Sequence, residues 1–307
     1  MLDKPLGLSS NAALQKVRRA LSAAKAGHVG SLDPLATGML PICLGEATKI
    51  AGDVLSGRKC YQFTISLGTR TATGDKEGEV VETLPIPPLQ LADVEAVLLR
   101  FTGHQTQVPP MYSALKRDGQ PLYRLARAGV EVEREAREIE IFALTWAGSG
   151  LTESAIELET TCSKGTYIRV LAEDIARALG TCGHVASLRR LYVEPFDSEP
   201  MDTLESIGKA CNTGDGPRIL PADWPLQHLP AVGLDAAATS RLLHGQNVVV
   251  RDNEAYGRVR LYDEKGQFVG MGAADGQGGV RPSRLFSLPL VAAGGPRVES
   301  RGLQKGI

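Results

Sequence analysis

The stretch GHVGSLDPLATGMLPICLGEATK, residues 27–49, is the most informative part of the chain. It holds one histidine, one aspartate, one glutamate, one lysine and four glycines. On residue chemistry alone, Asp33-Pro34 is an ordinary turn initiator, and His28 is an ordinary surface or hydrogen-bonded histidine. The mixture of Gly, Pro and short apolar pieces predicts a loop that leads into a short helix. A nucleotide-binding loop is disfavoured, because neither G-x-x-x-x-G-K-[ST] nor G-x-G-x-x-G occurs.

The segments around this stretch show both helical and strand patterns. Ser9 and Ser10 can cap a helix whose apolar residues recur at helical spacing. Residues 60–67 alternate cleanly, with Tyr61, Phe63, Ile65 and Leu67 on one face. Further strands are predicted at 138–146 and 154–162, and helices at 91–101 with Gly103 as its stop, between Pro121 and Gly129, and at 167–179. Strand pairs mixed with helices in this order predict an α+β fold.

The composition changes at ILPADWPLQHLP, residues 219–230, which we interpret as the approach to a linker. Beyond it, Asp235 can cap a helix that ends at His244-Gly245, and short strands are predicted near 247–251, 257–262 and 267–272. The sequence therefore predicts a large domain over 1–228, which the resemblance given below implies to be catalytic, and a small β-rich module over 229–291. Residues 292–307 have too few apolar side chains to pack and are predicted to be disordered.

Composition narrows the class of protein. Hydrophobic residues make up 43% and charged residues 22% of 307 residues, with a formal net charge of -1. The five cysteines are scattered and form no C-x-x-C pair, which argues against a disulfide framework or a structural zinc site. No apolar run approaches the ~20 residues that span a membrane, and the N-terminus lacks the apolar core of a signal peptide. We expect a cytoplasmic protein.

The stretch at 27–49 resembles the catalytic signature of the TruB family, the bacterial tRNA pseudouridine-55 synthases. Five further stretches match this family in the same order: LDKPLGLSS at 2–10, YQFTISLGTRTATGD at 61–75, QVPPMYSALKRDGQPLYRLARAG at 107–129, CSKGTYIRVLAEDI at 162–175 and GHVASLRRL at 183–191. The matches cover most of residues 1–191. More loosely, the C-terminal module is similar to a PUA-type RNA-binding domain.

The resemblance implies a pseudouridine synthase fold with a mixed, mainly antiparallel central sheet flanked by helices, followed by a small β-barrel-like PUA domain. It also implies an insertion at about 104–138 that grips the T-arm of tRNA. Within that insertion, Tyr112 and Lys116 are candidates for contact with the RNA, and Met111, Leu122 and Tyr123 could wedge into the loop or belong to the core. The expected enzyme acts alone, as a monomer and without a guide RNA.

The resemblance also assigns roles to single residues. Asp33 matches the essential aspartate, Tyr61 the aromatic residue that stacks on the target uracil, and Arg169 the arginine that pairs with the catalytic carboxylate. Further matching residues lie near the pocket, line it or organise it: His28, Lys49, Asp75, Leu188 and Arg190. From pattern alone, Tyr61 would be a half-buried strand tyrosine and Arg169 a solvated helix arginine.

The implied chemistry is consistent with these residues. Isomerisation breaks the N1–C1′ bond of uridine, turns the base and rejoins it through C5, so neither a cofactor nor a metal ion is required. Asp33 could attack the sugar, attack the base or remove a sugar proton, and the residues do not choose among these. Glycoside hydrolysis normally needs two carboxylates, whereas one aspartate kept ionised by Arg169 suits isomerisation. The base would be flipped into the pocket and stacked on Tyr61, whose hydroxyl is a candidate to take the C5 proton.

Three segments carry mostly or only positive charge and are candidates for phosphate contacts, although each could be a solvated face. They are 11–32, 112–129 and 175–193.

Two features depart from the family pattern: Met1 begins inside the first motif, where an incomplete start could weaken the first strand, and Ala72 stands where an acid is common. Three alternatives stay open: a base-excising glycosylase, a tRNA-folding chaperone without chemistry, and a guide-RNA-dependent synthase, which the 107–129 insertion disfavours.

Overall fold

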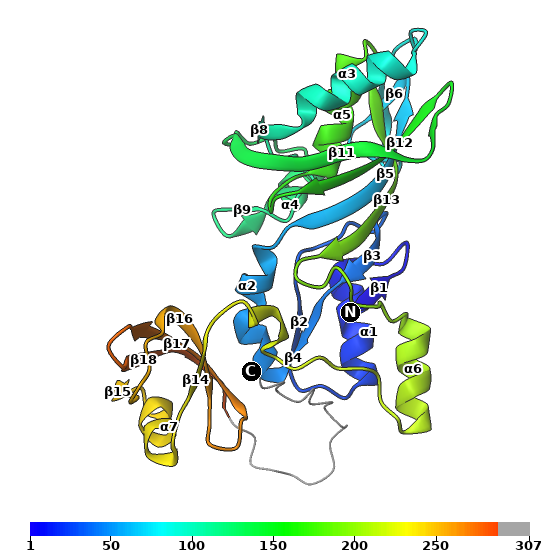
Figure 1. The fold of residues 1–307 in the computed structure, drawn as a ribbon. Coiled ribbons are helices and arrows are strands. Elements are labelled where there is room, and N and C mark those ends of the chain that lie inside the picture. The colour runs from blue at the N-terminus through cyan, green and yellow to red at the C-terminus, as the bar shows by residue number, and fades with distance from the viewer. Residues whose placement is uncertain (288–307) are drawn as a thin grey trace. The chain divides into compact units, whose positions relative to one another are not determined.

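The computed structural model describes residues 1–287, and the predicted tail from residue 292 lies outside them (Figure 1). The chain forms two compact units. The first contains Met1–Lys16, His28–Ile42 and Leu55–Leu204, and the second contains Val17–Gly27, Cys43–Val54 and the residues from Glu205 onward. By packing, residues 205–228 lie with the C-terminal module, whereas the sequence predicts a division after residue 228. The chain also crosses between the units four times before residue 56, which no sequence pattern indicates.

A seven-stranded sheet forms the centre of the first unit, in the order β1-β3-β13-β5-β12-β11-β8. Its strands are β1 (Leu2–Lys4), β3 (Thr37–Leu40), β5 (Lys59–Leu67), β8 (Gly103–Gln107), β11 (Arg137–Leu151), β12 (Ala155–Cys162) and β13 (Gly183–Val193). Every neighbouring pair is antiparallel except β3 with β13. The predicted mixed, mainly antiparallel sheet is confirmed.

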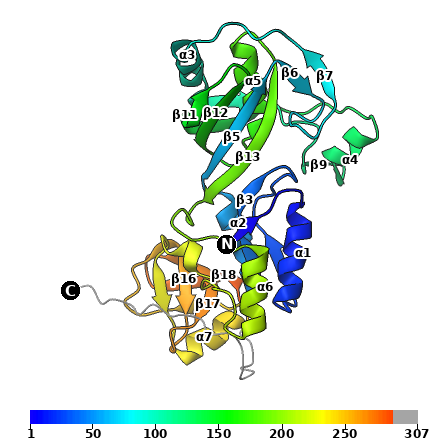
Figure 2. The same cartoon turned by 90° about the vertical axis from the view of Figure 1, so that its right-hand side faces the viewer.

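One face of this sheet carries the main core, covered by α3 (Leu91–Phe101) and α5 (Ile168–Ala178) (Figure 2). The predicted alternation in β5 is confirmed, because Phe63, Ile65 and Leu67 are buried in this core and Tyr61 packs against its border. Burying one such side chain is worth roughly 1.5–3 kcal/mol relative to exposing it. The core therefore fixes which face of β5 looks toward α5, and with it the face on which Tyr61 lies.

The predicted helix ends are confirmed by the structure. Beyond α3, Gly103 has a φ of +91°, a backbone conformation that favours glycine. Pro121 is the N-cap of α4 (Leu122–Arg127), and in α7 (Ala236–Leu243) the Asp235 carboxylate accepts a hydrogen bond from the amide of Ala238 at 2.7 Å. At α1 (Ser10–Ala20) the cap is Ser9, whose Oγ accepts from the amide of Ala12.

Several elements depart from the sequence-based expectation. Part of the expected loop at 27–49 is strand: β2 (Ala26–His28) pairs with β4 (Ile42–Leu44), and β3 lies in the central sheet. The expected short helix is present as a 3-10 turn, η1 (Gly45–Ile50), and α2 (Ala51–Leu55). Strand β11 is longer than predicted, and α6 (Leu204–Thr213) was not anticipated. Two small hairpins complete this part of the chain: β6 (Thr69–Thr71) with β7 (Val80–Thr83), and β9 (Lys116–Arg117) with β10 (Gln120–Pro121).

The second unit contains a curled five-stranded sheet in the order β14-β16-β17-β18-β15. Its strands are β14 (Ala231–Gly233), β15 (Val248–Val249), β16 (Tyr256–Tyr262), β17 (Phe268–Asp275) and β18 (Gly279–Leu285), of which β14 and β18 were not predicted. One cluster packs this sheet against α7. A second cluster joins Ile50 to Leu226, Met271 and Phe286, with Leu226 on the short turn η2 (Trp224–Leu226). The small β-rich module is confirmed.

Candidate active site

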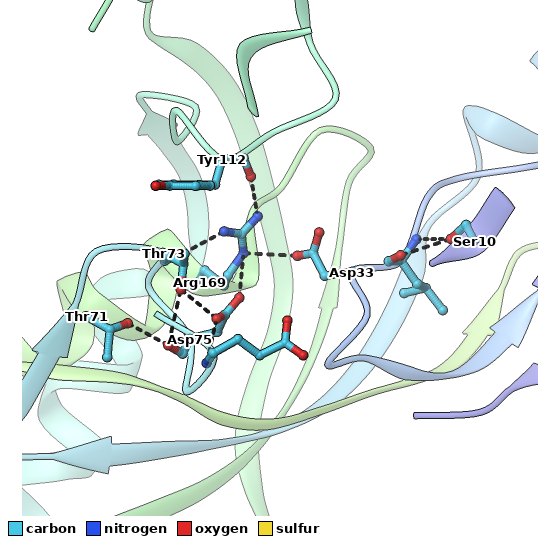
Figure 3. A network of polar contacts seen from close by, with 9 residues as sticks. Ser10, Asp33, Thr71, Thr73, Asp75, Tyr112 and Arg169 are labelled. Atoms are coloured by element: carbon cyan, nitrogen blue, oxygen red, sulfur yellow. Dashed lines mark hydrogen bonds and ion pairs between the residues drawn. The ribbon is translucent and has the colours of Figure 1, made fainter. Parts of the chain in front are cut away.

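Asp33 lies in the loop between β2 and β3, and its carboxylate meets the guanidinium of Arg169. The Oδ2 atom of Asp33 is 3.0 Å from Nε of Arg169 (Figure 3). The Asp33 side chain is 40% exposed, whereas that of Arg169 is 6% exposed. The carboxylate therefore has a solvent-facing side, while its cationic partner is held behind it in the protein.

Arg169 is fixed through all three of its side-chain nitrogens. Nη1 donates to the carbonyl of Thr73 and Nη2 to the carbonyl of Tyr112, both at 2.6 Å. Nε faces Asp33 and lies 3.9 Å from Oδ2 of Asp75. Because a guanidinium is a rigid planar donor fork, these contacts from separate segments set its orientation. Figure 3 shows Arg169 at the centre of this network.

Asp75 is buried and organises the turn that follows β6 (Thr69–Thr71). Its Oδ1 accepts from the Thr73 hydroxyl at 2.6 Å and from the amide of Glu77 at 3.1 Å, and its carbonyl accepts from the Thr71 hydroxyl. Of the two roles that the resemblance allows for Asp75, lining the pocket or organising it, these contacts favour organising. Neighbouring Ala72 is exposed, and its amide donates to the carbonyl of Glu79.

The pKa of the Asp33 carboxyl results from opposing contributions of burial and of neighbouring charges. Burial raises this pKa above its ordinary value, the Arg169 charge opposes the rise, Asp75 adds to it and Lys4 opposes it. The arginine therefore offsets the desolvation of Asp33 in part and does not reverse it. Lys4 is itself buried, with its amine on the carbonyls of Pro5 and Leu8, and burial lowers the pKa of its ammonium to about 8.

Tyr61 lies on β5 directly between Thr160 of β12 and Arg190 of β13 in the sheet register. Directly paired residues of neighbouring strands point to the same face, so Tyr61 and Arg190 share one. Burial raises the pKa of the Tyr61 phenol, and Arg190 opposes the rise. The role of the Tyr61 hydroxyl as acceptor of the C5 proton stays a prediction.

Arg190 is 1% exposed and stabilises the loop that carries Asp33. Its Nε donates to the carbonyl of Met39 at 2.7 Å and its Nη2 to the carbonyl of Gly30 at 2.8 Å. Of the two roles that the sequence allows, lining or organising, these contacts favour organising. Leu188 is buried opposite Phe63 in the main core. His28 is half-buried, and burial together with the Arg190 charge lowers the pKa of its imidazole.

The expected place of Lys49 near the pocket stays a prediction. Lys49 belongs to the second unit, where its amine contacts the Glu46 carboxylate at 2.5 Å and donates to the carbonyl of Leu285 at 2.7 Å. Lys116 is exposed on β9. Tyr112 reaches the network through its backbone carbonyl. Among the predicted residues, the structure thus brings together Asp33, Arg169, Asp75 and the backbone of Tyr112.

Tyr167 is a further candidate for the active site, and the sequence analysis did not single it out. It immediately precedes α5, and the pKa of its phenol is raised by burial, with Ser113, Arg169 and Asp33 among the groups that act on it. Its position two residues before Arg169 in GTYIR was the signal available in the sequence.

Over residues 1–287, no three His, Cys, Asp or Glu side chains are grouped to hold a metal ion. Within the same residues, no helix is long and apolar enough to cross a membrane.

Three family models match consecutive parts of the chain. The first, described as the TruB family pseudouridylate synthase N-terminal domain, matches residues 18–168. The others are described as the tRNA pseudouridylate synthase B C-terminal domain, at 169–227, and as Pseudouridine synthase II TruB, C-terminal, at 230–286. Asp33, Tyr61 and Asp75 fall within the first match, and Arg169 begins the second.

Curated relatives align over nearly the whole chain. "tRNA pseudouridine synthase B" of Burkholderia mallei (strain NCTC 10247) is 47% identical over 291 residues, covering 93% of this chain and 95% of the relative. The protein of the same name from Pseudomonas putida (strain GB-1) is 49% identical over 290 residues, covering 93% and 94%. The chain belongs to the TruB family. As a TruB pseudouridylate synthase it is an isomerase.

Solved structures show that the TruB chain shares its architecture with more distant proteins. A chain from the structure described as "Crystal Structure of a Cbf5-Nop10-Gar1 Complex" superposes with a TM-score of 0.66 at 25% identity, covering 90% of this chain and 78% of that one. A chain from "Structure of H/ACA RNP bound to a substrate RNA containing 2'-deoxyuridine" gives 0.67 at 21% identity, covering 93% and 84%. The second likeness concerns the fold alone.

Proposed function

We propose that this protein isomerises the uridine at position 55, in the T-loop of tRNA, to pseudouridine, with Asp33 as its catalytic residue. The observation that carries the proposal is the ion pair of a partly exposed Asp33 with a buried, fully oriented Arg169. Family membership supplies the reaction class, and the relatives' name, tRNA pseudouridine synthase B, supports the substrate.

The reaction conserves every atom of the nucleotide. The N1–C1′ bond breaks and a C5–C1′ bond forms, while a proton leaves C5 and a proton is gained at N1. Asp33 supplies a partly exposed carboxylate that would face the base, Arg169 keeps it oriented, and Tyr61 offers a ring on which the flipped uracil stacks for roughly 1–3 kcal/mol. These residues need no redox partner for this isomerisation.

RNA would be held by cations outside the catalytic network. Lys116 and Arg117 are exposed on hairpin β9-β10, and Arg124 and Arg127 follow on α4. This segment lies within the predicted insertion, which we propose contacts the T-arm without a guide RNA. Its backbone reaches the active site at Tyr112, whose carbonyl accepts from Arg169.

The decisive experiment compares Asp33→Asn with the unmodified protein on a T-arm stem-loop transcript, without cofactor. We expect pseudouridine, measured by release of tritium from [5-³H]uridine and by nucleoside mapping, to fall below about one thousandth of wild type, because the only group proposed to act on the glycosidic bond is lost. Binding of the transcript should change little, since the phosphate contacts lie elsewhere.

The matched control is Asp174→Asn, which removes a carboxylate paired with Arg177 on α5 and should leave turnover unchanged. Near wild-type turnover of Asp33→Asn would refute the catalytic role. Free uracil in the reaction would instead indicate a base-excising glycosylase, and tight binding with no product from the wild-type protein would indicate a folding chaperone.

A further inference from the structure

The residue before Asp33 is held by a single buried side chain from another element. Ser10, the first residue of α1, is 5% exposed, and its hydroxyl donates to the carbonyl of Leu32 at 2.9 Å. The same oxygen accepts from the amide of Leu32 at 2.7 Å (Figure 3). Two bonds from one atom to one residue fix the position and rotation of the backbone that carries the Asp33 side chain.

The backbone that leads into Arg169 is held in the same manner. Gln107, at the end of β8, is 5% exposed, and its amide nitrogen donates to the carbonyl of Tyr167 at 3.3 Å. Its amide oxygen accepts from the backbone N–H of Tyr167 at 3.0 Å. Tyr167 directly precedes the first turn of α5, which contains Arg169. The arginine is thus tied to an edge strand of the central sheet.

The neighbours of these two residues behave differently. Ser9 makes an exposed cap contact with the amide of Ala12, and the side chain of Gln105, on the same strand as Gln107, donates to the carbonyl of Arg100 at the surface. Only Ser10 and Gln107 of the four are buried. Because buried backbone groups are nearly always paired, removing either side chain leaves an amide and a carbonyl to find new partners by moving the backbone.

We propose that Ser10 and Gln107 are positioning residues that together set the separation between the Asp33 carboxylate and the Arg169 guanidinium. Ser10 holds the acidic partner and Gln107 the basic one, each through two bonds to a neighbouring residue. Neither side chain contacts the carboxylate or the guanidinium. The importance of this separation for turnover rests on the proposed function of Asp33, whereas the separation itself is a property of the free protein.

The first measurement follows the Asp33 carboxyl in the free protein by ¹³C NMR titration of aspartate-labelled samples. The groups that act on it are Arg169 from α5, Asp75 from the turn after β6 and Lys4 from β1. We expect Ser10→Ala and Gln107→Met each to raise its pKa, because the stabilising contact with Arg169 lengthens. Their matched controls, Ser9→Ala and Gln105→Met, should titrate as wild type.

Arg169→Met serves as the reference, since it removes the contact altogether. In that background Ser10→Ala should add little further rise, because the interaction that it disturbs is already absent. A purely structural role would instead give equal effects with and without Arg169. If Ser10→Ala fails to fold, Ser10→Cys keeps a weaker hydrogen-bonding group at the same place and should give a smaller shift in the same direction.

The second measurement is turnover on the T-arm transcript. We expect kcat to fall about 10- to 100-fold in Ser10→Ala and Gln107→Met with KM within about twofold of wild type, as for a small misplacement of reacting groups. An unchanged Asp33 pKa in folded Ser10→Ala and Gln107→Met proteins would overturn the proposal. Normal turnover of Asp33→Asn would overturn the proposed function instead, and the NMR titration would still decide the positioning role.

Discussion

The negative charge of Asp33 lowers the stability of the folded protein relative to the unfolded chain. Since burial raises the pKa of its carboxyl, the folded protein binds this proton more tightly than the unfolded chain does. Ionisation of Asp33 therefore disfavours folding, and this loss sets in as the pH rises through the folded pKa. Arg169 and Lys4 reduce the loss without removing it. A functional group that opposes stability in this way is common at active sites.

The Asp33→Asn variant, which is neutral and has nearly the same shape, tests whether the charge of Asp33 lowers the stability of the folded protein. We expect Asp33→Asn to melt at or above the wild-type temperature at pH 7.5, because the amide has no charge to desolvate. The difference should shrink as the pH falls and the wild-type carboxyl becomes protonated. Scanning calorimetry at several pH values measures both quantities. A melting temperature that falls at pH 7.5 and recovers toward acid pH would contradict the raised pKa.

Lys49 connects two segments of the second unit that lie far apart in the sequence. Its amine connects Glu46 to the carbonyl of Leu285, and the same Glu46 carboxylate accepts from the amide of Ser287 at 2.7 Å. These contacts fasten the end of β18 onto η1 within the second unit. Through these contacts Lys49 stabilises the second unit.

We expect Lys49→Met to cost about 1 kcal/mol of unfolding free energy, because the pair is about one-third exposed and one hydrogen bond to a carbonyl is lost. Hydrogen exchange at the Ser287 amide should accelerate, while the Asp33 carboxyl should titrate as in wild type. Lys265→Met, an exposed lysine of the same unit, is the control. A shifted Asp33 titration in Lys49→Met would show that Lys49 acts on the active site after all.

Strand β3 is the element whose geometry is most demanding. It pairs in parallel with β13 at Arg189 and Arg190, next to the Asp33 loop. Gly38 in this strand has a φ of +99°, and a Cβ there would lie 2.1 Å from the carbonyl oxygen of Arg190. Neither the conformation nor the space admits a side chain. The glycine therefore permits the close approach of the two strands that flank the active site.

Gly38→Ala should destabilise the protein by at least about 2 kcal/mol, since backbone strain and a clash with backbone act together. Gly52→Ala in α2 is the matched control: no atom lies within 4 Å of its added Cβ, and alanine favours a helix. Urea unfolding of both variants gives the comparison. Equal midpoints would mean that β3 relaxes away from β13 without loss.

The elements differ in how far local sequence predicts them. Helices α3, α5 and α7 and strand β5 have regular periodicity together with a cap or a glycine stop, so their extents were predicted closely. Strand β3 was missed because its four residues, TGML, form no alternating pattern and become a strand only by pairing with β13. Asp33 and Arg169 were identified through the family motifs; their contact at 3.0 Å depends on β5 and β13 bringing distant segments together.

The two compact units do not correspond to two consecutive stretches of the chain. Segments 17–27 and 43–54 belong to the second unit, although they flank the segment that contains Asp33. The apolar cluster of that unit includes Ile50 from the early part of the chain together with Leu226, Met271 and Phe286 from the late part. Arg258 of β16 reinforces the connection through its ion pair with Asp53.

Because early and late segments of the chain pack together in the second unit, a change at one end of the gene affects the residues encoded at the other. A stop codon after residue 204 would not simply delete the terminal β-rich module, because Ile50 would be left without Leu226, Met271 and Phe286 and would expose an apolar surface in the nascent protein. Recombination that exchanges the C-terminal coding region for an unrelated one meets the same obstacle. The two ends of the reading frame are therefore expected to be inherited together.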